Sequence, residues 1–259
     1  MNASKSHAAS IGINVESLLR ELRLRGMRDF YASAIDTAER ENFGFLEFLQ
    51  SLLEVESSER KRRRIGRHLQ RSGLPEGKTL SALDVKRFPV KVRRVLPVLC
   101  SGDFVSRGDN VLTFGLPGRG KTHLCAAVGH ELIKLGFQVF FTPAFALVQR
   151  LLLAKKELCL DAELRRLDRF DVIILDDIGY VQHSRDEMSV LFTFLSERYE
   201  RKSVMLTSNL VFSQWEKIFQ DPMTTAAAID RLVHHCTIIE MSGKSLRAEA
   251  AKKRREGST

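Results

Sequence analysis

Near the middle of the chain runs Gly115-Leu116-Pro117-Gly118-Arg119-Gly120-Lys121-Thr122, which matches the pattern G-x-x-x-x-G-K-[ST]. Its glycines allow the backbone to curl tightly, so that several N–H groups point at a polyphosphate. Lys121 is placed to reach the β- and γ-phosphates of a nucleotide, and the Thr122 hydroxyl is placed to bind Mg²⁺. The stretch therefore predicts a phosphate-binding loop for a nucleotide and its metal ion.

The flanking residues give this loop the context that the motif requires. Residues 111–114 predict a buried strand that enters the loop. Residues 123–134 carry apolar side chains at helical spacing and predict a helix that leaves the loop and ends at Gly136. Strand, loop and helix in this order argue against a chance glycine-rich turn. We therefore expect residues 115–122 and the adjacent His123 to contact the nucleotide.

A second signature follows the loop, where the apolar residues 172–175 lead into Asp176 and Asp177. At the end of a buried strand, Asp176 is placed to hold Mg²⁺, directly or through water. Asp177 is placed to orient or deprotonate the attacking water. Asp is also common in turns, but its position after a phosphate loop favours the catalytic interpretation.

Two further polar sites are open to more than one interpretation. Residues 203–209 predict a strand ending in Asn209, whose amide is placed to polarise the attacking water or touch the γ-phosphate; a turn or N-cap role is the alternative. His234 and His235 invite a metal interpretation, but adjacent residues on a helix do not face one site. No carboxylate or cysteine cluster accompanies the pair, so we expect a structural role for it.

The bulk composition fits one α/β domain of ordinary size with a small appendage, because the chain has 259 residues and 44% of them are hydrophobic. A net charge of +9 favours a polyanionic partner, although a solvated basic surface is the alternative. The four cysteines lack disulfide or metal-ligand spacing, which predicts reduced cytosolic thiols. No signal peptide or membrane-spanning run is found, so we expect a cytoplasmic protein without a membrane partner.

Residues 1–75 predict a small helical N-terminal domain, and residues 76–259 the nucleotide-binding domain. A first helix is expected to begin at Asn14 and to stop at Gly26. Apolar residues at helical spacing predict two more helices, around residues 27–35 and 45–53, with stripes that pack in a core or against a partner helix.

The last of these helices is predicted to continue into a basic run at residues 60–71. At helical spacing, one face of this run would carry Arg60, Arg64, Arg67 and Arg71. Such a row is a plausible track for a phosphate backbone, and we favour contact with DNA or RNA. The alternative is a solvated face paired with Glu54, Glu56 and Glu59.

Taken together, these segments resemble the AAA+ ATPases, within the initiator-like branch of DnaA, DnaC and IstB, and they are most similar to the IstB type. The resemblance covers nearly the whole chain. It is carried by residues 120–124, 175–180, 207–210, 212–235 and 243–247. It implies an α/β fold with a central parallel sheet, a P-loop strand inside it, a minimal C-terminal lid and a small helical N-terminal domain.

The resemblance also implies roles for particular residues. Asn209 matches the sensor-1 residue, and Arg247 matches the sensor-2 arginine that acts within its own subunit. Arg231 matches the arginine finger, which acts on ATP held by a neighbouring subunit. Many AAA+ enzymes carry Glu where this chain has Asp177, so the shorter side chain suggests slow hydrolysis.

The function implied is that of an ATPase with ATP and Mg²⁺ as cofactors, which assembles on duplex DNA in an ATP-dependent manner. Such a helper delivers target DNA to an IstA-type transposase. A DnaC-like loader of a replicative helicase is the alternative. A small-molecule P-loop kinase is a third hypothesis, but the sequence shows no evident site for an acceptor substrate.

Overall fold

The computed structural model describes residues 13–180, 184–215 and 222–242. The chain divides into two compact units, residues 1–67 and 68–259, which are described here one at a time. Arg247 and the predicted lid helix lie outside the described residues.

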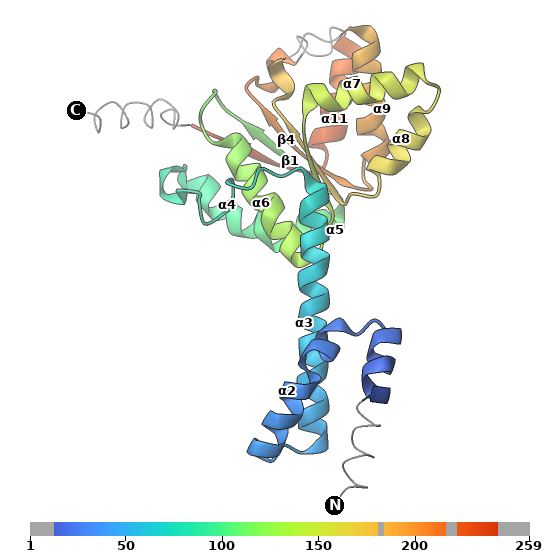
Figure 1. Ribbon diagram of the computed structural model, residues 1–259. Helices are drawn as coiled ribbons and strands as arrows, with labels where there is room; N and C mark the ends of the chain where they lie inside the picture. Colours follow the sequence, from blue (N-terminus) through green and yellow to red (C-terminus); the bar gives the residue numbers. More distant parts are fainter. Residues whose placement is uncertain (1–12, 181–183, 216–221, 243–259) are drawn as a thin grey trace, which may run out of the picture. The chain divides into compact units, whose positions relative to one another are not determined.

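The first unit is helical, as predicted (Figure 1). Residues 13–21 form a short helix, which is followed by α2 (Arg25–Glu41) and by the first part of α3 (Phe45–Ser72). The prediction that the third helix runs on into the basic stretch is confirmed, because α3 is continuous through Arg71.

The predicted helix stop at Gly26 is wrong. The first helix ends at Glu21, and the chain turns at Arg23, whose φ of 57° lies in the left-handed region. Gly26 instead lies buried in the first turn of α2, where a Cβ atom would come within 2.9 Å of the Glu56 Cα. The glycine is therefore required for the close approach of α2 and α3.

The apolar side chains of this unit are only partly buried. Met27 and Ala34 are buried together with the carboxylate of Glu56, whereas Phe45 is 96% exposed and Leu46 81% exposed. The expected stripes thus form a small core and leave much apolar surface in contact with solvent. A unit of this size buries little area on folding, so each buried contact matters for its stability.

The second unit contains a sheet of five parallel strands in the order β2-β3-β4-β1-β5. The strands are β1 (Asn110–Phe114), β2 (Val139–Pro143), β3 (Val172–Asp176), β4 (Ser203–Ser208) and β5 (Cys236–Glu240). The three inner strands are almost wholly buried, which explains their continuous runs of apolar residues. This confirms the predicted α/β fold, with β1 inside the sheet and β4 at its centre.

Helices cover both faces of this sheet (Figure 1). One face carries α4 (Val90–Ser101) and α6 (Lys121–Leu135), and the other carries α7 (Ala144–Lys156), α9 (Arg185–Arg198) and α11 (Pro222–Val233). The shorter helices are η1 (Val85–Arg87), α5 (Asp103–Arg107), α8 (Leu160–Leu167), η2 (Ile178–Tyr180) and η3 (Phe212–Gln214). None of the described helices is long and apolar enough to cross a membrane.

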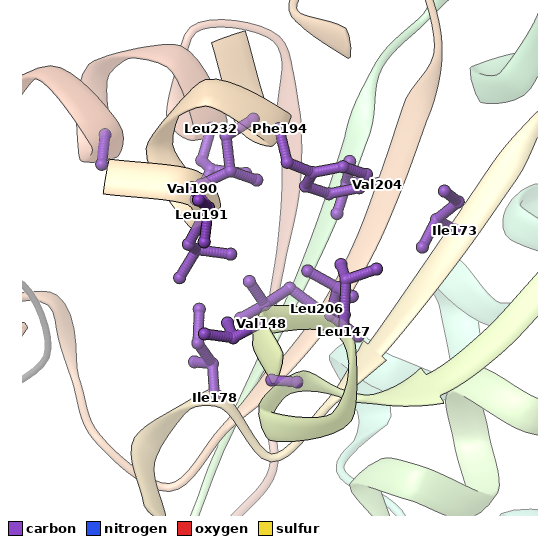
Figure 2. Packing of buried hydrophobic residues seen from close by; sticks show 14 of the residues in the cluster. Leu147, Val148, Ile173, Ile178, Val190, Leu191, Phe194, Val204, Leu206 and Leu232 are labelled. Atoms are coloured by element: carbon purple, nitrogen blue, oxygen red, sulfur yellow. The ribbon is translucent and has the colours of Figure 1, made fainter. Parts of the chain in front are cut away.

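The main core lies under the second of these helical layers (Figure 2). Leu147 from α7, Leu191 from α9 and Leu232 from α11 pack toward Val204 and Leu206 of β4. All five of these side chains are less than 3% exposed. Because such a core is closely packed, it fixes the positions of the strand ends that carry the polar residues.

Candidate nucleotide-binding site and arginine hollow

The phosphate-binding motif connects the end of β1 to the beginning of α6. Gly118 and Gly120 have φ values of 78° and 90°, in the region that glycine adopts readily. Gly115 also has positive φ, 149°, and a Cβ atom there would lie 2.5 Å from the carbonyl oxygen of Met241. The loop conformation therefore requires glycine at these positions, and it places backbone N–H groups at the N-terminus of α6.

Lys121 occupies the first position of α6, with only 5% of its surface exposed. Its ammonium group donates to the carbonyl oxygens of Gly115 at 2.7 Å and Leu116 at 3.2 Å. The lysine thus lies within the curl of the loop and already contacts oxygen atoms. Thr122 follows in the first turn of the helix. This donor set is chemically suited to phosphate oxygens.

Two other motif residues have distinct surroundings. Arg119 Nη1 is buried and has no hydrogen-bond partner among the described residues. His123 Nε2 lies 3.2 Å from the carbonyl oxygen of Thr79, so this nitrogen is the donor of a hydrogen bond to the segment before the sheet. The ring of His123 therefore connects α6 to that segment.

Asp176 and Asp177 are held by a threonine of the neighbouring strand. The Thr207 hydroxyl donates to Asp176 Oδ1 at 2.7 Å and accepts from the Asp177 N–H at 2.9 Å. Asp177 adopts a φ of 58°, an uncommon conformation that Asp tolerates better than most residues. Thr207 was not singled out from the sequence as a positioning residue. The sequence feature that could have indicated this role is the position of Thr207 at the end of a strand, directly before Ser208 and Asn209.

Asn209 packs against the turn that follows Asp177. A Cβ atom at Gly179 would lie 2.1 Å from Asn209 Oδ1, so the amide fits only against a glycine. This Oδ1 atom is buried and has no hydrogen-bond partner among the described residues. A buried acceptor without a partner is costly, which indicates a place where a ligand, an ion or water completes the site.

The strand order brings these residues to one edge of the sheet. β1 pairs with β4 and β4 with β3, and Thr113 lies opposite Thr207 in the register. The carboxyl ends of these three parallel strands therefore present the phosphate loop, the two aspartates and Asn209 side by side. This edge is where open α/β sheets bind their ligands.

Arg231 lies at the opposite end of the strands. The side-chain amide of Asn110, the first residue of β1, donates to the carbonyl oxygen of Leu232 at 3.2 Å. β1 spans about 13 Å at its usual rise per residue, and the phosphate loop begins only after its last residue. The Arg231 guanidinium stacks on the ring of Phe192 at 4.3 Å. It is therefore not brought to the nucleotide site of its own chain.

Three of the four cysteine thiols are poorly suited to nucleophilic chemistry because burial raises their pKa values. Burial raises the pKa of Cys125, which lies in α6 behind the loop, to about 12. Burial also raises the pKa values of Cys100 and Cys236 to about 11. All four cysteines are free, as predicted, although Cys159 is exposed.

The expectation that His234 and His235 lie on a helix with no carboxylate beside them was wrong. The two residues follow the end of α11 in a turn, and their ring centroids lie 4.3 Å apart. A carboxylate does accompany them, because Glu200 Oε1 lies 3.4 Å from His234 Nδ1. Glu200 is distant in the sequence and belongs to the turn after α9, so no local pattern could have revealed it.

The first unit carries a separate basic feature, which we call the arginine hollow. It is an open hollow of about 1110 Å³. Apart from Leu19 and Ser57, every lining residue is basic: Arg20, Arg23, Arg25, Arg28, Arg60, Lys61, Arg63, Arg64 and Arg67. The arginines before residue 30 were missed by the sequence analysis, because they are scattered along the chain and converge only in the folded unit.

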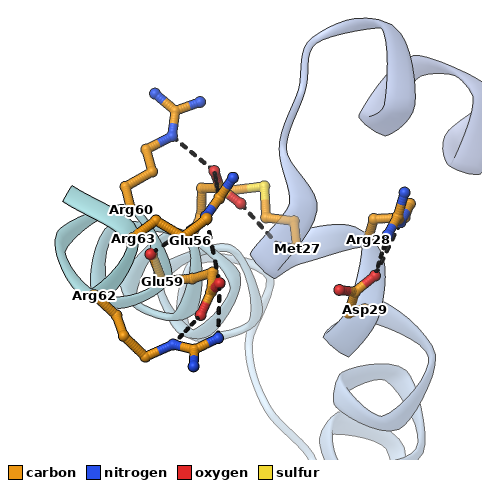
Figure 3. Close-up of polar contacts among 8 residues, drawn as sticks. All are labelled: Met27, Arg28, Asp29, Glu56, Glu59, Arg60, Arg62 and Arg63. Carbon is orange, nitrogen blue, oxygen red and sulfur yellow. Dashed lines mark hydrogen bonds and ion pairs between the residues drawn. The ribbon is translucent and has the colours of Figure 1, made fainter. Parts of the chain in front are cut away.

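Among the described residues, the basic run of α3 contains both paired and unpaired arginines, and Figure 3 shows the paired ones. Arg60 donates to the buried carboxylate of Glu56 at 2.7 Å, and Arg62 and Arg63 pair with Glu59. No acidic partner is found within the described residues for Arg64 and Arg67. Part of the run is thus paired within α3, as the alternative interpretation proposed, and part is available to another anion.

Arg71 lies in the last turn of α3, within the second unit. It is not one of the residues that line the arginine hollow.

Known proteins similar to this chain include several encoded by insertion sequences. It is 43% identical over 235 residues to a putative insertion sequence ATP-binding protein of Sinorhizobium fredii, which covers 90% of this chain and 79% of the relative. It is 36% identical over 239 residues to the insertion sequence IS21 putative ATP-binding protein of Pseudomonas aeruginosa, covering 92% of this chain and 90% of the relative.

Solved structures show the same fold at low sequence identity. The replication initiator DnaA, solved with AMPPCP and single-stranded DNA, aligns with a TM-score of 0.57 at 19% identity over 72% of this chain and 56% of that chain. DnaI aligns with a TM-score of 0.55 at 22% identity over 66% of this chain and 96% of that chain. These matches show that the chain shares the fold of these proteins. Residues 17–255 also match the family described as IstB-like ATP binding protein, and the chain belongs to this family.

Proposed function

We propose that this protein is an ATP-dependent helper of transposition, which assembles on duplex DNA and delivers it to an IstA-type transposase. The observation that carries this proposal is that one chain contains both features: a phosphate loop with two aspartates in the second unit, and an arginine-lined hollow in the first. The similarity to ATP-binding proteins of insertion sequences supports the biological setting.

ATP is expected to bind with its phosphates in the curl of residues 115–122. Lys121 then exchanges the carbonyl oxygens of Gly115 and Leu116 for the β- and γ-phosphates, to which its ammonium group is more strongly attracted. Thr122 and Asp176 would hold Mg²⁺, which neutralises charge on the phosphates. Thr207 orients Asp176 for this task through the hydrogen bond to Oδ1.

Hydrolysis is assigned to Asp177 and Asn209. The backbone of Asp177 is fixed by Thr207, which keeps its carboxylate at the strand end, where it can orient the attacking water. Asn209 offers a buried amide oxygen without a partner among the described residues, which can accept a hydrogen bond from that water. The nucleophile is water, and no residue of the chain is required to form a covalent intermediate.

Arg231 is proposed to act on the ATP of a neighbouring subunit. Its distance from the phosphate loop of its own chain favours action in trans, because the length of β1 separates them. An arginine finger of this kind stabilises charge in the transition state. Hydrolysis would then depend on assembly, which suits a protein that switches between assembled and dispersed states.

Contact with DNA is assigned to the arginine hollow of the first unit. Arg64 and Arg67 are without an acidic partner among the described residues, and Arg23 and Arg25 face the same hollow. Phosphate contacts of this type fix a protein on DNA but carry little sequence information. We therefore expect binding to duplex DNA with weak sequence preference.

Electron microscopy of the full chain with duplex DNA tests this proposal. With ATP, we expect ordered assemblies along the duplex, and with ADP we expect dispersed protein. When an IstA-type transposase is added, we expect it to bind only to the DNA that carries the assembled protein. Ordered assembly without nucleotide, or assembly on single strands alone, would contradict the proposal. The second result would favour a loader of a replicative helicase.

A further inference from the structure

A group of metal-binding side chains lies at the amino ends of the strands, away from the nucleotide site. Glu200 comes from the turn between α9 and β4, and His234 and His235 come from the turn between α11 and β5. One ligand atom from each of the three residues can be chosen so that all lie within 4.8 Å of one another. All three residues are exposed, so an ion from solution has direct access.

We propose that Glu200, His234 and His235 form a binding site for Zn²⁺ or a similar divalent transition-metal ion. Two imidazole nitrogens and one carboxylate oxygen form a donor set that such ions bind well, with water completing the coordination. The imidazoles disfavour Mg²⁺ and Ca²⁺, which prefer oxygen ligands. A carboxylate among the ligands suits a dication.

The distance between the ligand atoms of His234 and Glu200 supports a tetrahedral site. His234 Nδ1 lies 3.4 Å from Glu200 Oε1. Two ligands held about 2.0–2.1 Å from zinc at the tetrahedral angle lie about 3.3–3.4 Å apart. The separation of these two atoms therefore matches the edge of the required tetrahedron.

The backbone around these residues is held in place by the second unit. The carbonyl oxygen of His235 accepts a hydrogen bond from the N–H of Asn110 at 2.7 Å, which anchors the turn to β1. Glu200 adopts a φ of 55°, and a Cβ atom at Gly108 would lie only 3.3 Å from its carbonyl group. A non-glycine residue keeps this conformation only where the surrounding structure holds it there, and such residues are common at ligand sites.

Tyr199 supports the same side chains and competes for one of them. Its hydroxyl lies 2.7 Å from His234 Nδ1, and its ring stacks on the imidazole. A metal ion bound at Nδ1 would displace the hydrogen bond between Tyr199 and His234.

Metal binding would join the turn after α9 to the turn after α11. It would fix the C-terminal end of α11, the helix that carries Arg231. The inference does not depend on the proposed transposition function, because it rests on residues at the opposite end of the sheet from the phosphate loop. A failure of either proposal therefore leaves the other unaffected.

The test is a titration of the metal-free full chain with Zn²⁺, followed by substitution with Co²⁺. We expect Zn²⁺ to bind at this site and to raise the unfolding temperature of the protein. Glu200→Gln and His235→Ala should each weaken Zn²⁺ binding by at least about tenfold, on the scale known for perturbed metal sites. Tyr199→Phe should bind Zn²⁺ as tightly as the wild type or more tightly, because it removes the competing hydrogen bond.

Glu197→Gln is the matched control, because Glu197 is an exposed carboxylate near the end of α9, the helix that precedes Glu200. It should leave Zn²⁺ affinity unchanged. The substituted residues are exposed except for Tyr199, which is half-buried, and unfolding of the metal-free forms will show whether each variant is folded. Equal Zn²⁺ affinity in the wild type and in His235→Ala would overturn the assignment. So would thiolate-to-Co²⁺ charge-transfer bands in the near ultraviolet, which would indicate a cysteine site instead.

Discussion

The two units of this protein carry their polar residues in opposite ways. In the second unit, the aspartates and the phosphate loop lie at the ends of strands whose apolar residues are almost completely buried. In the first unit, the arginines lie on helices whose own core is small, and Phe45 and Leu46 remain exposed. One unit therefore holds a few groups rigidly, and the other spreads charge over a surface.

This difference follows from the chemistry that each unit is proposed to perform. Phosphoryl transfer depends on positioning within fractions of an ångström, so it needs a rigid scaffold. Attraction to a phosphate backbone depends mainly on the number of charges, and it tolerates looser positions. Single substitutions should therefore have large effects in the second unit and graded effects in the first.

The largest effect is expected from Arg231. Arg231→Ala alone and Lys121→Ala alone should each lose ATPase activity, by about 10³–10⁵-fold for the arginine finger. A mixture of the two variants should recover part of the activity, because some interfaces then combine an intact finger with an intact loop. The measurement is steady-state ATP hydrolysis on duplex DNA at several mixing ratios.

A control is needed because Arg231 also stacks on Phe192, a contact worth about 0.5–2 kcal/mol. Thermal unfolding of Arg231→Ala should show that the variant is folded. If assembly is intact and no mixing ratio restores hydrolysis, Arg231 has a structural role only.

Asp177→Asn should slow hydrolysis while it preserves ATP binding. The variant keeps the backbone bond to Thr207 but loses the carboxylate that orients or deprotonates water, which is worth about 10²–10⁴-fold. The assembled state should consequently persist for longer. Single-turnover hydrolysis and equilibrium binding of ATP separate the two effects. Turnover equal to that of the wild type would assign the water-orienting role to another group.

Thr207→Val tests the link between the two aspartates and has a matched control in the neighbouring strand. The change leaves the Asp177 N–H without its hydroxyl partner and should cost about 1–3 kcal/mol in the free energy of unfolding. It should also weaken Mg²⁺-dependent ATP binding. Thr113→Val affects the residue directly opposite in the register, whose hydroxyl lies 3.5 Å from Cys125 Sγ. Equal effects of both changes would rule out a special role for Thr207.

In the first unit, Glu56→Gln should reduce stability by a smaller amount, about 1–2 kcal/mol. Desolvation opposes ionisation of Glu56, but hydrogen bonds from Arg60 and from the backbones of Met27 and Gly26 outweigh it and lower the pKa. The carboxylate therefore stabilises the folded unit above its ordinary pKa of 4.5, and this contribution is lost as the pH falls through the lowered value.

Hydrogen exchange of α2 and α3 at neutral and acid pH will measure this contribution. Glu54→Gln is the control, because Glu54 is exposed on the same helix and should change stability by less than about 0.5 kcal/mol. Protection factors, which correct for the pH dependence of intrinsic exchange, should fall as the pH drops through the lowered pKa of Glu56; protection that stays the same from neutral pH to well below 4.5 would contradict the assigned role of Glu56.

Much of the second unit could be predicted from the sequence, because its signals are local. Glycines at residues 115, 118 and 120 are required by the backbone of the loop, and continuous apolar runs are typical of buried parallel strands. The role of Thr207 was harder to see, since it depends on the pairing of β3 with β4. The stacking of Arg231 on Phe192 likewise depends on the packing of two helices, so neither segment alone predicts it.

The first unit shows where local reasoning fails. Gly26 follows the rule for a helix stop, but the turn is made by Arg23, and Gly26 serves the contact with α3 instead. The arginine hollow collects residues from three helical segments, whereas the sequence showed only the run in α3. Glu200 likewise lies close to His234 and His235 in the folded chain although it is distant from them in the sequence. Tertiary contacts of this kind determine which charged groups are paired and which are available.

The most direct test of the account is the salt dependence of binding to duplex DNA, measured with ATP present. The hollow variant carries Arg25→Gln, Arg64→Gln and Arg67→Gln, and a control variant loses equal charge elsewhere through Arg40→Gln, Arg62→Gln and Arg169→Gln. We predict that the hollow variant has a log–log slope smaller by about 2–3, because each phosphate that the protein no longer neutralises lowers the slope by about 0.9, with ATP affinity unchanged. Equal slopes for the hollow and control variants would contradict the assignment of DNA binding to the arginine hollow.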